Sequence, residues 1–405
     1  MNVFLIPSWY PHDGNPLEGC FIAEQARAFA EIHPEHRIAV SVCGAGAYHL
    51  HFRKPGWPLL VCKRLFSRDE IRRPLPNLIE LQRPCLEWTW RLAGGNLKSR
   101  LAGAERNLEV AKREMGGIDI IHAHVTYLGG WIAAELARRH RLPFVITEHM
   151  GPFPFAEARF LTPEGHLTPW LRQPLEQADA VVAVSDYQAD RIASFGLKRP
   201  GVIPNVVDER QFRPSDRPAA ADPIFLSVAS LVEAKGIGEL LAAIARNRGL
   251  GFRSRHLIAG DGTAAASFRR QAEELGISDQ IDWLGMVGRD ALPEVFRRAD
   301  AFVLASWQET FGVVYAEALA SGLPVIASRC GGPDTMITPE DGLLIPPRDV
   351  DALATALRQM TLGIASFDRQ GIRERFLSRF SRPVVAGKLL DLYSSTLAAS
   401  PPELR

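Results

Sequence analysis

Two glutamates, Glu309 and Glu317, lie eight positions apart directly after a short apolar run, Ala301–Leu304. The run predicts a buried strand, so Glu309 falls in the following loop and Glu317 inside the next helix. Backbone N–H groups at a helix start, here around 311–313, lack intrahelical partners and can bind hydroxyl or phosphate oxygens. A carboxylate can accept paired hydrogen bonds from a vicinal diol. The segment therefore suits a nucleotide sugar, although the residues alone also allow Glu309 to cap the helix and Glu317 to pair with an arginine.

Lys235 stands at a second predicted strand–loop–helix boundary, within the segment 227–236. An ammonium group at a helix start beside a diphosphate is electrostatically favourable. Taken alone, Lys235 is equally well explained as an ordinary exposed lysine. Its interpretation as a phosphate ligand depends on what surrounds it.

The segment 306–325 resembles the EX7E signature of family 4 glycosyltransferases, which are retaining enzymes with the GT-B fold. The resemblance implies that Glu309 contacts the transferred sugar and that Glu317 contacts the ribose of the nucleotide donor. The backbone groups expected to assist them belong to Phe311, Gly312 and Val313.

The segment 227–236 resembles the loop in which this family places an arginine and a lysine on the donor diphosphate. Lys235 keeps the place of the lysine, whereas Ser230 stands where the arginine is expected. The resemblance therefore implies a diphosphate site with one cation fewer than usual, in which the Ser230 hydroxyl can donate a hydrogen bond.

Other strand ends also match the family pattern. Gly260 is expected to line the nucleotide pocket, and backbone groups of Met286 and Val287 are expected to hold the base. In the first half of the chain, Gly19 keeps one of two glycines that give the donor phosphates room, and Glu18 replaces the other.

His149 follows the predicted strand 144–147 and resembles the family histidine that approaches the outer hydroxyls of the donor sugar. His149 and Glu309 are therefore the expected catalytic residues. His122 and His124 form an HxH pair, for which structural or acceptor-side roles are favoured over metal binding because no third ligand is recognisable. The single DxD, Asp349 to Asp351, is expected to begin a helix. Neither a metal nor another cofactor is expected.

The elements that must position these residues are short apolar runs alternating with helical patterns along the whole chain. Most of the runs are unbroken rather than alternating, as in strands covered on both faces. The pattern predicts an α/β protein with two Rossmann-like, doubly wound parallel sheets. Such sheets bind ligands beyond the carboxyl ends of their strands, so two of them facing each other across a cleft would hold the donor there.

The proline-rich stretch 204–223 has the composition of a linker and predicts a domain boundary. We expect an N-terminal acceptor-side domain over 1–205, with an insertion at about 50–85 that carries short strands, and a C-terminal donor domain over 206–380. The resemblance implies that the helix predicted in 381–405 crosses back to the first domain.

Length and composition fit a globular two-domain enzyme of 405 residues with a net charge of +1, which gives no reason to expect nucleic acid as a partner. Five scattered cysteines and no long apolar run predict a cytoplasmic protein. Residues 53–114 contain 14 Lys or Arg against 7 Asp or Glu. This stretch is either a solvated surface or a patch that contacts anionic lipid at the inner face of a membrane.

The sequence thus predicts a retaining glycosyltransferase that moves a sugar from a nucleotide-diphosphate donor to a saccharide or lipid-linked acceptor. Relatives of this kind often build cell-surface polysaccharide or glycolipid. Two alternatives remain open, namely a sugar-nucleotide 2-epimerase and a non-catalytic nucleotide-binding partner. The donor sugar, its base, the acceptor and the oligomeric state are not determined by the sequence.

Overall fold

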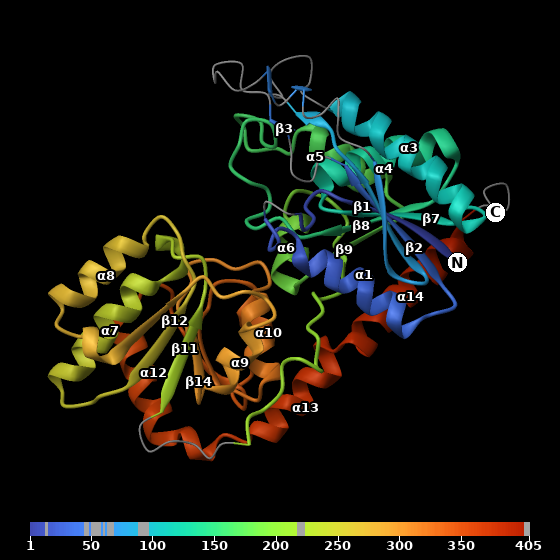
Figure 1. Cartoon of the computed structure of the whole chain (residues 1–405). Coiled ribbons are helices and arrows are strands. Elements are labelled where there is room, and N and C mark those ends of the chain that lie inside the picture. The colour runs from blue at the N-terminus through green and yellow to red at the C-terminus, as the bar shows by residue number, and fades with distance from the viewer. Residues whose placement is uncertain are drawn as a thin grey trace. The chain divides into compact units, whose positions relative to one another are not determined.

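The computed structural model describes residues 1–12, 15–43, 48–49, 58–59, 61–62, 69–87, 97–216 and 223–400. The chain divides into two compact units. Unit 1 comprises Met1–Val184, Ala189–Val206 and Val385–Arg405, and unit 2 comprises Ser185–Gln188 and Val207–Val384. Each unit contains one large, mainly parallel sheet with helices on both faces (Figure 1). The predicted α/β class with two parallel-sheet domains is confirmed.

The sheet of unit 1 is made of eight strands, of which the first is buried along nearly its whole length. They are β1 (Asn2–Pro7), β2 (Arg37–Cys43), β4 (Glu70–Leu75), β5 (Leu78–Arg83), β7 (Ile120–His124), β8 (Phe144–Glu148), β9 (Ala180–Ala183) and β10 (Gly201–Val202). Their order is β10-β9-β8-β7-β1-β2-β5-β4, parallel except for the antiparallel pair of β4 and β5. A separate two-stranded pair joins β3 (Tyr48–His49) and β6 (Leu86–Glu87).

Helices cover both faces of this sheet, as Figure 1 shows. One core contains residues of α3 (Leu97–Met115), α4 (Trp131–His140), α5 (Pro169–Gln177) and α6 (Asp186–Ala193). The core on the opposite face contains residues of α1 (Cys20–Ile32) and α14 (Arg382–Ala399). From α14, the side chains of Val385, Leu389 and Tyr393 are buried in this second core.

The segment 50–85, expected to be an insertion with short strands, does form strands, and they belong to the main sheet of unit 1. Its residues 70–83 form β4 and β5, and β5 pairs in parallel with β2. The proline at position 74 lies in β4, the outermost strand, where a missing N–H is tolerated. Most of the rest of the segment lies outside the described residues.

Two basic side chains of the stretch 53–114 pair with acidic side chains of the same stretch, which leaves its excess of positive charge unchanged. Arg73 pairs with Glu114, and Lys112 pairs with Glu109. Among the described residues, no helix is both long enough and apolar enough to cross a membrane.

Unit 2 has a six-stranded, fully parallel sheet with the order β13-β12-β11-β14-β15-β16. Its strands are β11 (Ile224–Val228), β12 (Arg255–Ala259), β13 (Ile281–Gly285), β14 (Ala301–Leu304), β15 (Val325–Ser328) and β16 (Gly342–Ile345). Its helices are α7 (Ile237–Gly249), α8 (Ala265–Glu274), α9 (Leu292–Arg297), α10 (Val313–Ala320), α11 (Gly332–Met336), α12 (Val350–Gly363) and α13 (Arg369–Phe380). The Asp349 side chain accepts a hydrogen bond from the Ala352 amide at 2.8 Å and so caps α12.

Both sheets reverse their strand order at one internal position. In unit 2 the reversal lies between β11 and β14, and in unit 1 it lies between β1 and β7. Chain segments that leave neighbouring strands at such a point diverge to opposite faces and leave a crevice at the carboxyl edge. Ligand-binding residues are therefore expected in the loops after these four strands.

Gly236 shows how closely the backbone is packed at the reversal point of unit 2. It has φ of 69° before the first residue of α7, and a Cβ atom at this position would lie 2.0 Å from the carbonyl oxygen of Ala305. Only glycine fits such a contact without moving the backbone.

We therefore predict that Gly236→Ala lowers the free energy of unfolding by about 2–4 kcal/mol, from left-handed strain and overlap together. Chemical denaturation of the purified protein measures the change. Gly249→Ala at the other end of α7 is the matched control, because no atom lies within 4 Å of the added Cβ and alanine is favoured in helices. Equal destabilisation by the two substitutions would contradict the packing argument.

Candidate active site

An ion pair occupies the reversal point of unit 2. The Lys235 Nζ lies 2.7 Å from the Glu309 Oε1, and the Ser306 hydroxyl donates to the same oxygen at 2.8 Å. Lys235 follows β11 and Glu309 follows β14, so two distant motifs meet at one place. The Lys235 and Glu309 side chains are 28% and 12% exposed. An ammonium and a carboxylate are thus held together in a partly buried site.

The backbone of Glu309 is fixed by the segment that follows β15. The Glu309 amide donates to the Cys330 carbonyl at 3.0 Å, and the Gly332 amide donates to the Glu309 carbonyl at 2.8 Å. A Cβ at Gly331 would lie 2.4 Å from the Glu309 carbonyl oxygen. Burial, together with Glu309 and Asp334, raises the pKa of the Cys330 thiol to about 12. These residues therefore hold Glu309 in place and leave a neutral thiol behind it.

The start of α10 has the features expected of a backbone-binding segment. Gly312 precedes the helix with φ of 79°, and a Cβ there would lie 2.5 Å from the Tyr315 ring. Phe311 is buried with its ring 5.8 Å from that of Phe380, so only its backbone is placed to meet a ligand. Val313 is half-buried as the first residue of α10. The Tyr315 amide donates to the Gly312 carbonyl at 3.0 Å, so the first amides of α10, at Val313 and Val314, are the ones placed to meet a ligand.

Glu317 has a different environment from Glu309. Its side chain is fully buried on α10 and forms an ion pair with Arg289, which follows β13. Pairing of Glu317 with an arginine is the alternative that the residues alone allowed. A ribose that reaches Glu317 must displace or join the Arg289 guanidinium, so the ribose-binding role of Glu317 stays a prediction.

The other predicted donor residues of unit 2 gather at the same sheet edge. Ser230, Gly260 and Met286 follow β11, β12 and β13, and Met286 is 64% exposed. Val287 is half-buried beside it. The Gly260 Cα lies so close to the loop after β11 that a Cβ would be 1.8 Å from the Ala229 carbonyl oxygen. Packing between loops thus accounts for this glycine whether or not it also contacts a nucleotide.

Sequence reasoning missed several side chains near this edge. Ser306 directly precedes the recognised motif and could have been singled out as a hydroxyl beside it. Arg289 carried no signal at all. Arg348 carried no signal either. Its guanidinium lies 3.9 Å from the centre of the Trp307 ring, and the Trp307 indole donates to Glu239 at 2.7 Å.

The predicted residues of unit 1 lie near the reversal point of its sheet. His149 follows β8, and its Nε2 lies 2.9 Å from the Nδ1 of His124. His122 lies within 2.7 Å of both the Tyr393 hydroxyl and the Thr147 hydroxyl. The His122 and His124 ring centroids are 4.2 Å apart, so three imidazoles form one buried cluster.

Burial sets the charge state of this histidine cluster. It lowers the pKa values of His122 and His149 to about 3. It also lowers the pKa of His124 well below its ordinary value, and the neighbouring imidazoles add to that effect. The cluster is therefore neutral at physiological pH. Its imidazoles can donate and accept hydrogen bonds but carry no positive charge.

Two further features support the loops of unit 1. The buried Glu148 carboxylate accepts hydrogen bonds from the amides of Thr126, His149 and Met150 at 2.9, 2.7 and 2.6 Å. Gly19 precedes α1 with φ of 62°, and a Cβ there would lie 2.4 Å from the Trp9 carbonyl oxygen. Gly19 is thus explained by the turn, and its contact with donor phosphates stays a prediction.

Within the described ranges, no group of three or more His, Cys, Asp or Glu side chains is arranged to hold a metal ion. The interactions of His122 and His124 are with hydroxyl groups, other imidazoles and the surrounding core.

Two family models match the chain. The model described as Glycosyltransferase Family 4 matches residues 26–211, and the model described as Glycosyl transferases group 1 matches residues 208–363. A D-inositol 3-phosphate glycosyltransferase of Saccharomonospora viridis is 31% identical over 325 residues, which are 71% of this chain and 73% of the relative. A glycogen synthase of Mycobacterium tuberculosis is 30% identical over 286 residues, 68% of each chain.

Solved structures with the same fold cover nearly the whole chain. A sucrose-phosphate synthase from Thermosynechococcus elongatus has a TM-score of 0.74 at 22% identity, covering 99% of this chain and 100% of its own. Anabaena HepE in complex with UDP has a TM-score of 0.68 at 17% identity, covering 98% of this chain and 100% of its own.

The neutral histidine cluster predicts a specific pH dependence. Because the folded-state pKa values of His122 and His149 are about 3, protonation below the unfolded value of about 6.5 favours the unfolded chain. The free energy of unfolding should be fully retained above about pH 6.5 and fall by about 1.4 kcal/mol per pH unit for each histidine below it. Denaturant titrations at several pH values measure this slope.

His122→Leu should reduce that slope by the contribution of one histidine, whatever it does to stability at neutral pH. A slope unchanged by the substitution, or histidine NMR signals of His149 that titrate near pH 6.5, would contradict the assignment of a neutral cluster.

Proposed function

The chain belongs to the family 4 glycosyltransferases with the GT-B fold, and we propose that it transfers a sugar from a nucleotide-diphosphate donor to an acceptor hydroxyl with retention of anomeric configuration. The donor is held by unit 2. The acceptor is a saccharide or a lipid-linked saccharide, and the biological role is the synthesis of cell-surface polysaccharide or glycolipid.

The observation that carries the proposal is the Lys235–Glu309 ion pair at the reversal point of the unit 2 sheet. A sugar nucleotide offers a diphosphate to an ammonium group and a row of hydroxyls to a carboxylate. Both protein groups lie where a doubly wound sheet binds its ligand. Each of them exchanges its present partner for one on the donor.

The reaction separates charge between the sugar and the leaving diphosphate. Lys235 and the amides at the start of α10 stabilise the negative charge that develops on the diphosphate. Glu309 accepts hydrogen bonds from sugar hydroxyls and fixes the sugar against the acceptor. The acceptor hydroxyl attacks from the face that the diphosphate leaves, and its proton passes to a departing phosphate oxygen. This course needs no protein nucleophile and no metal ion.

Ser230 makes the diphosphate site weaker than the family pattern implies. Its exposed hydroxyl can donate one hydrogen bond, but it brings no charge to the diphosphate. Lys235 then supplies the cationic contact at the end of β11, and we expect affinity for the diphosphate to depend strongly on this one side chain.

His149 supports the proposal from unit 1. It is neutral, half of its hydrogen-bonding capacity is engaged by His124, and it lies at the carboxyl end of β8. A neutral imidazole can donate to a sugar hydroxyl without repelling the cationic character of the transition state. Contact of unit 1 with a membrane stays a prediction, as does the place of the reaction in the cell.

Donor identity and stereochemistry test the proposal directly. A thermal-shift panel of UDP, GDP, ADP and their sugars identifies the donor, and NMR of the product reports the anomeric configuration. We expect retention, and an inverted product would exclude the same-face reaction. Incubation with donor alone should leave the sugar unchanged, whereas its isomerisation would indicate an epimerase.

Substitutions at the ion pair separate the two proposed roles. Lys235→Met should weaken nucleoside diphosphate binding about tenfold or more, because a charge-assisted contact is lost. Glu309→Gln should strengthen binding of the same diphosphate by a few-fold, because Lys235 no longer has an anionic competitor. It should nevertheless lower kcat/KM for transfer about a hundredfold, because the sugar loses its orienting carboxylate. Calorimetry and initial rates measure the two effects.

Lys388→Met and Glu273→Gln are matched controls on exposed helix positions outside the site and should change neither quantity. If Glu309→Gln weakens diphosphate binding as much as Lys235→Met does, the two side chains act as one structural unit and the division of roles is wrong.

A further inference from the structure

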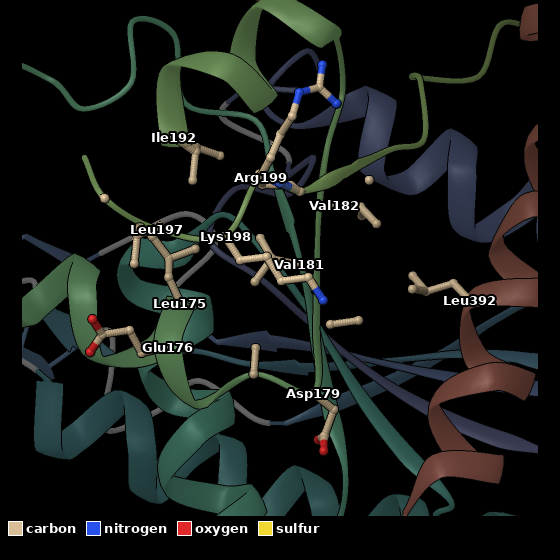
Figure 2. Close-up of a pocket in the computed structure, with 15 residues that line it drawn as sticks. Leu175, Glu176, Asp179, Val181, Val182, Ile192, Leu197, Lys198, Arg199 and Leu392 are labelled. Atoms are coloured by element: carbon tan, nitrogen blue, oxygen red, sulfur yellow. The ribbon is translucent and has the colours of Figure 1, made fainter. Parts of the chain in front are cut away.

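A cavity of about 490 Å³ lies in unit 1, away from the residues discussed above. It is formed by the end of α5, the start of β9, the loop between α6 and β10, and Leu392 of α14 (Figure 2). Its volume lies within the roughly 300–1,000 Å³ range of small-molecule sites. The cavity therefore has room for a ligand of several carbon atoms.

The cavity exists because the sheet of unit 1 ends unevenly. Strand β10 pairs only with Val182 and Ala183 of β9. The first half of β9, Ala180 and Val181, pairs with β8 on one side and faces the cavity on the other. The loop at 196–200 passes this edge without joining the ladder. A recess is thus left between the two helical layers.

The walls of the recess are mainly apolar. Leu175 and Ile192 are buried side chains of the core on one face of the sheet, and Leu392 packs on the core of the other face. Val181 and Leu197 complete the apolar lining. Burial of a short hydrocarbon chain here removes apolar surface from water on both partners, which is favourable by about 25 cal/mol per Å².

One cation distinguishes the recess from a plain apolar pocket. Figure 2 shows Lys198 extending across the middle of the lining residues, whereas Arg199 and Glu176 point outward. Glu176 pairs with Arg172, and Arg199 pairs with Asp190. Among the described residues, no carboxylate or other group forms a hydrogen bond or an ion pair with the Lys198 ammonium.

The remaining charged residue of the lining is also engaged. Asp179 accepts a hydrogen bond from the Phe144 amide at 2.8 Å, and its carboxylate points away from the centre of the cavity in Figure 2. Of the charged side chains in the lining, the solvent-exposed Lys198 is therefore the one whose ammonium a ligand can approach without breaking a contact within the described residues.

We propose that this cavity binds a small amphipathic anion, with an apolar chain against Leu175, Ile192 and Leu392 and a carboxylate on Lys198. A medium-chain carboxylate has this chemistry. Lys198 is exposed, so water solvates its ammonium in the free protein, and a carboxylate gains a partly screened ion pair that an uncharged chain lacks. A purely polar anion would leave the apolar walls in contact with water. The assignment does not depend on the proposed transfer reaction.

The position of Leu392 connects the cavity with the histidine cluster. The next residue of α14 is Tyr393, whose hydroxyl lies 2.7 Å from the His122 Nδ1. His122 in turn contacts His124, which bonds to His149. A ligand that displaces α14 at Leu392 also displaces the Tyr393 hydroxyl. Occupation of the cavity should therefore be sensed at His122.

The test uses the full chain and decanoate, below its micelle-forming concentration, in isothermal titration calorimetry at low salt. We expect saturable binding at one site, about fivefold weaker in Lys198→Met because one ion pair is lost. Leu392→Trp, which fills the cavity, should weaken binding about tenfold or more. Lys388→Met removes an exposed lysine of α14 outside the lining and should leave binding unchanged.

Decanol provides the uncharged comparison. It should bind more weakly than decanoate to the wild-type protein, and this difference should be absent in Lys198→Met. In histidine-selective NMR, saturating decanoate should shift the His122 ring signals. Absence of saturable decanoate binding would overturn the proposal. So would binding that is lost in Leu392→Trp but unaffected by Lys198→Met, since the pocket would then be purely apolar. Unmoved His122 signals on saturation would refute the connection through α14.

Discussion

The contact between Lys235 and Glu309 is the interaction on which the proposed donor site depends. Removing two opposite charges partly from water has an unfavourable desolvation free energy. Neighbouring groups offset it by holding the two side chains in a good hydrogen-bonding geometry. Ser306 donates to the carboxylate, and the Cys330–Gly332 backbone fixes the loop that carries it. The ion pair orients both side chains before a ligand arrives. A donor then has only to exchange partners with them, without ordering a mobile site.

Backbone proximity makes this arrangement possible. Gly236, Gly260 and Gly331 each lie where a Cβ atom would overlap a carbonyl oxygen of the neighbouring loop. The loops after β11, β12, β14 and β15 are thereby packed directly on one another, and the charged groups are carried by a rigid edge. In unit 1 the equivalent stability comes from buried polar contacts, with Glu148 holding three amides and three neutral imidazoles held between Thr147 and Tyr393.

The sequence predicts the fold well because buried parallel strands are continuous apolar runs that need no distant information. The runs 144–147 and 301–304, expected as strands, are β8 and β14 of the structure, and His149 and Glu309 follow them as expected. Contacts that depend on distant partners could not be read in the same way. The sequence allowed Glu317 to pair with an arginine but did not identify that arginine as Arg289. The hydrogen bond between His122 and Tyr393 joins residues that are far apart in the chain. Short strands were expected in the proline-rich segment 50–85, but the pairing of β5 with β2 in the main sheet could not be read from it. The cavity beside β9 arises because β10 pairs only with the second half of that strand.

A crystal structure of the protein with its intact nucleotide sugar tests the central claim most directly. In the complex, the Lys235 Nζ should lie within hydrogen-bonding distance of a diphosphate oxygen, and the Glu309 carboxylate should accept from a sugar hydroxyl. The Lys235–Glu309 contact of the free protein should be lengthened or lost. A diphosphate bound elsewhere, with that ion pair intact at 2.7 Å, would contradict the account.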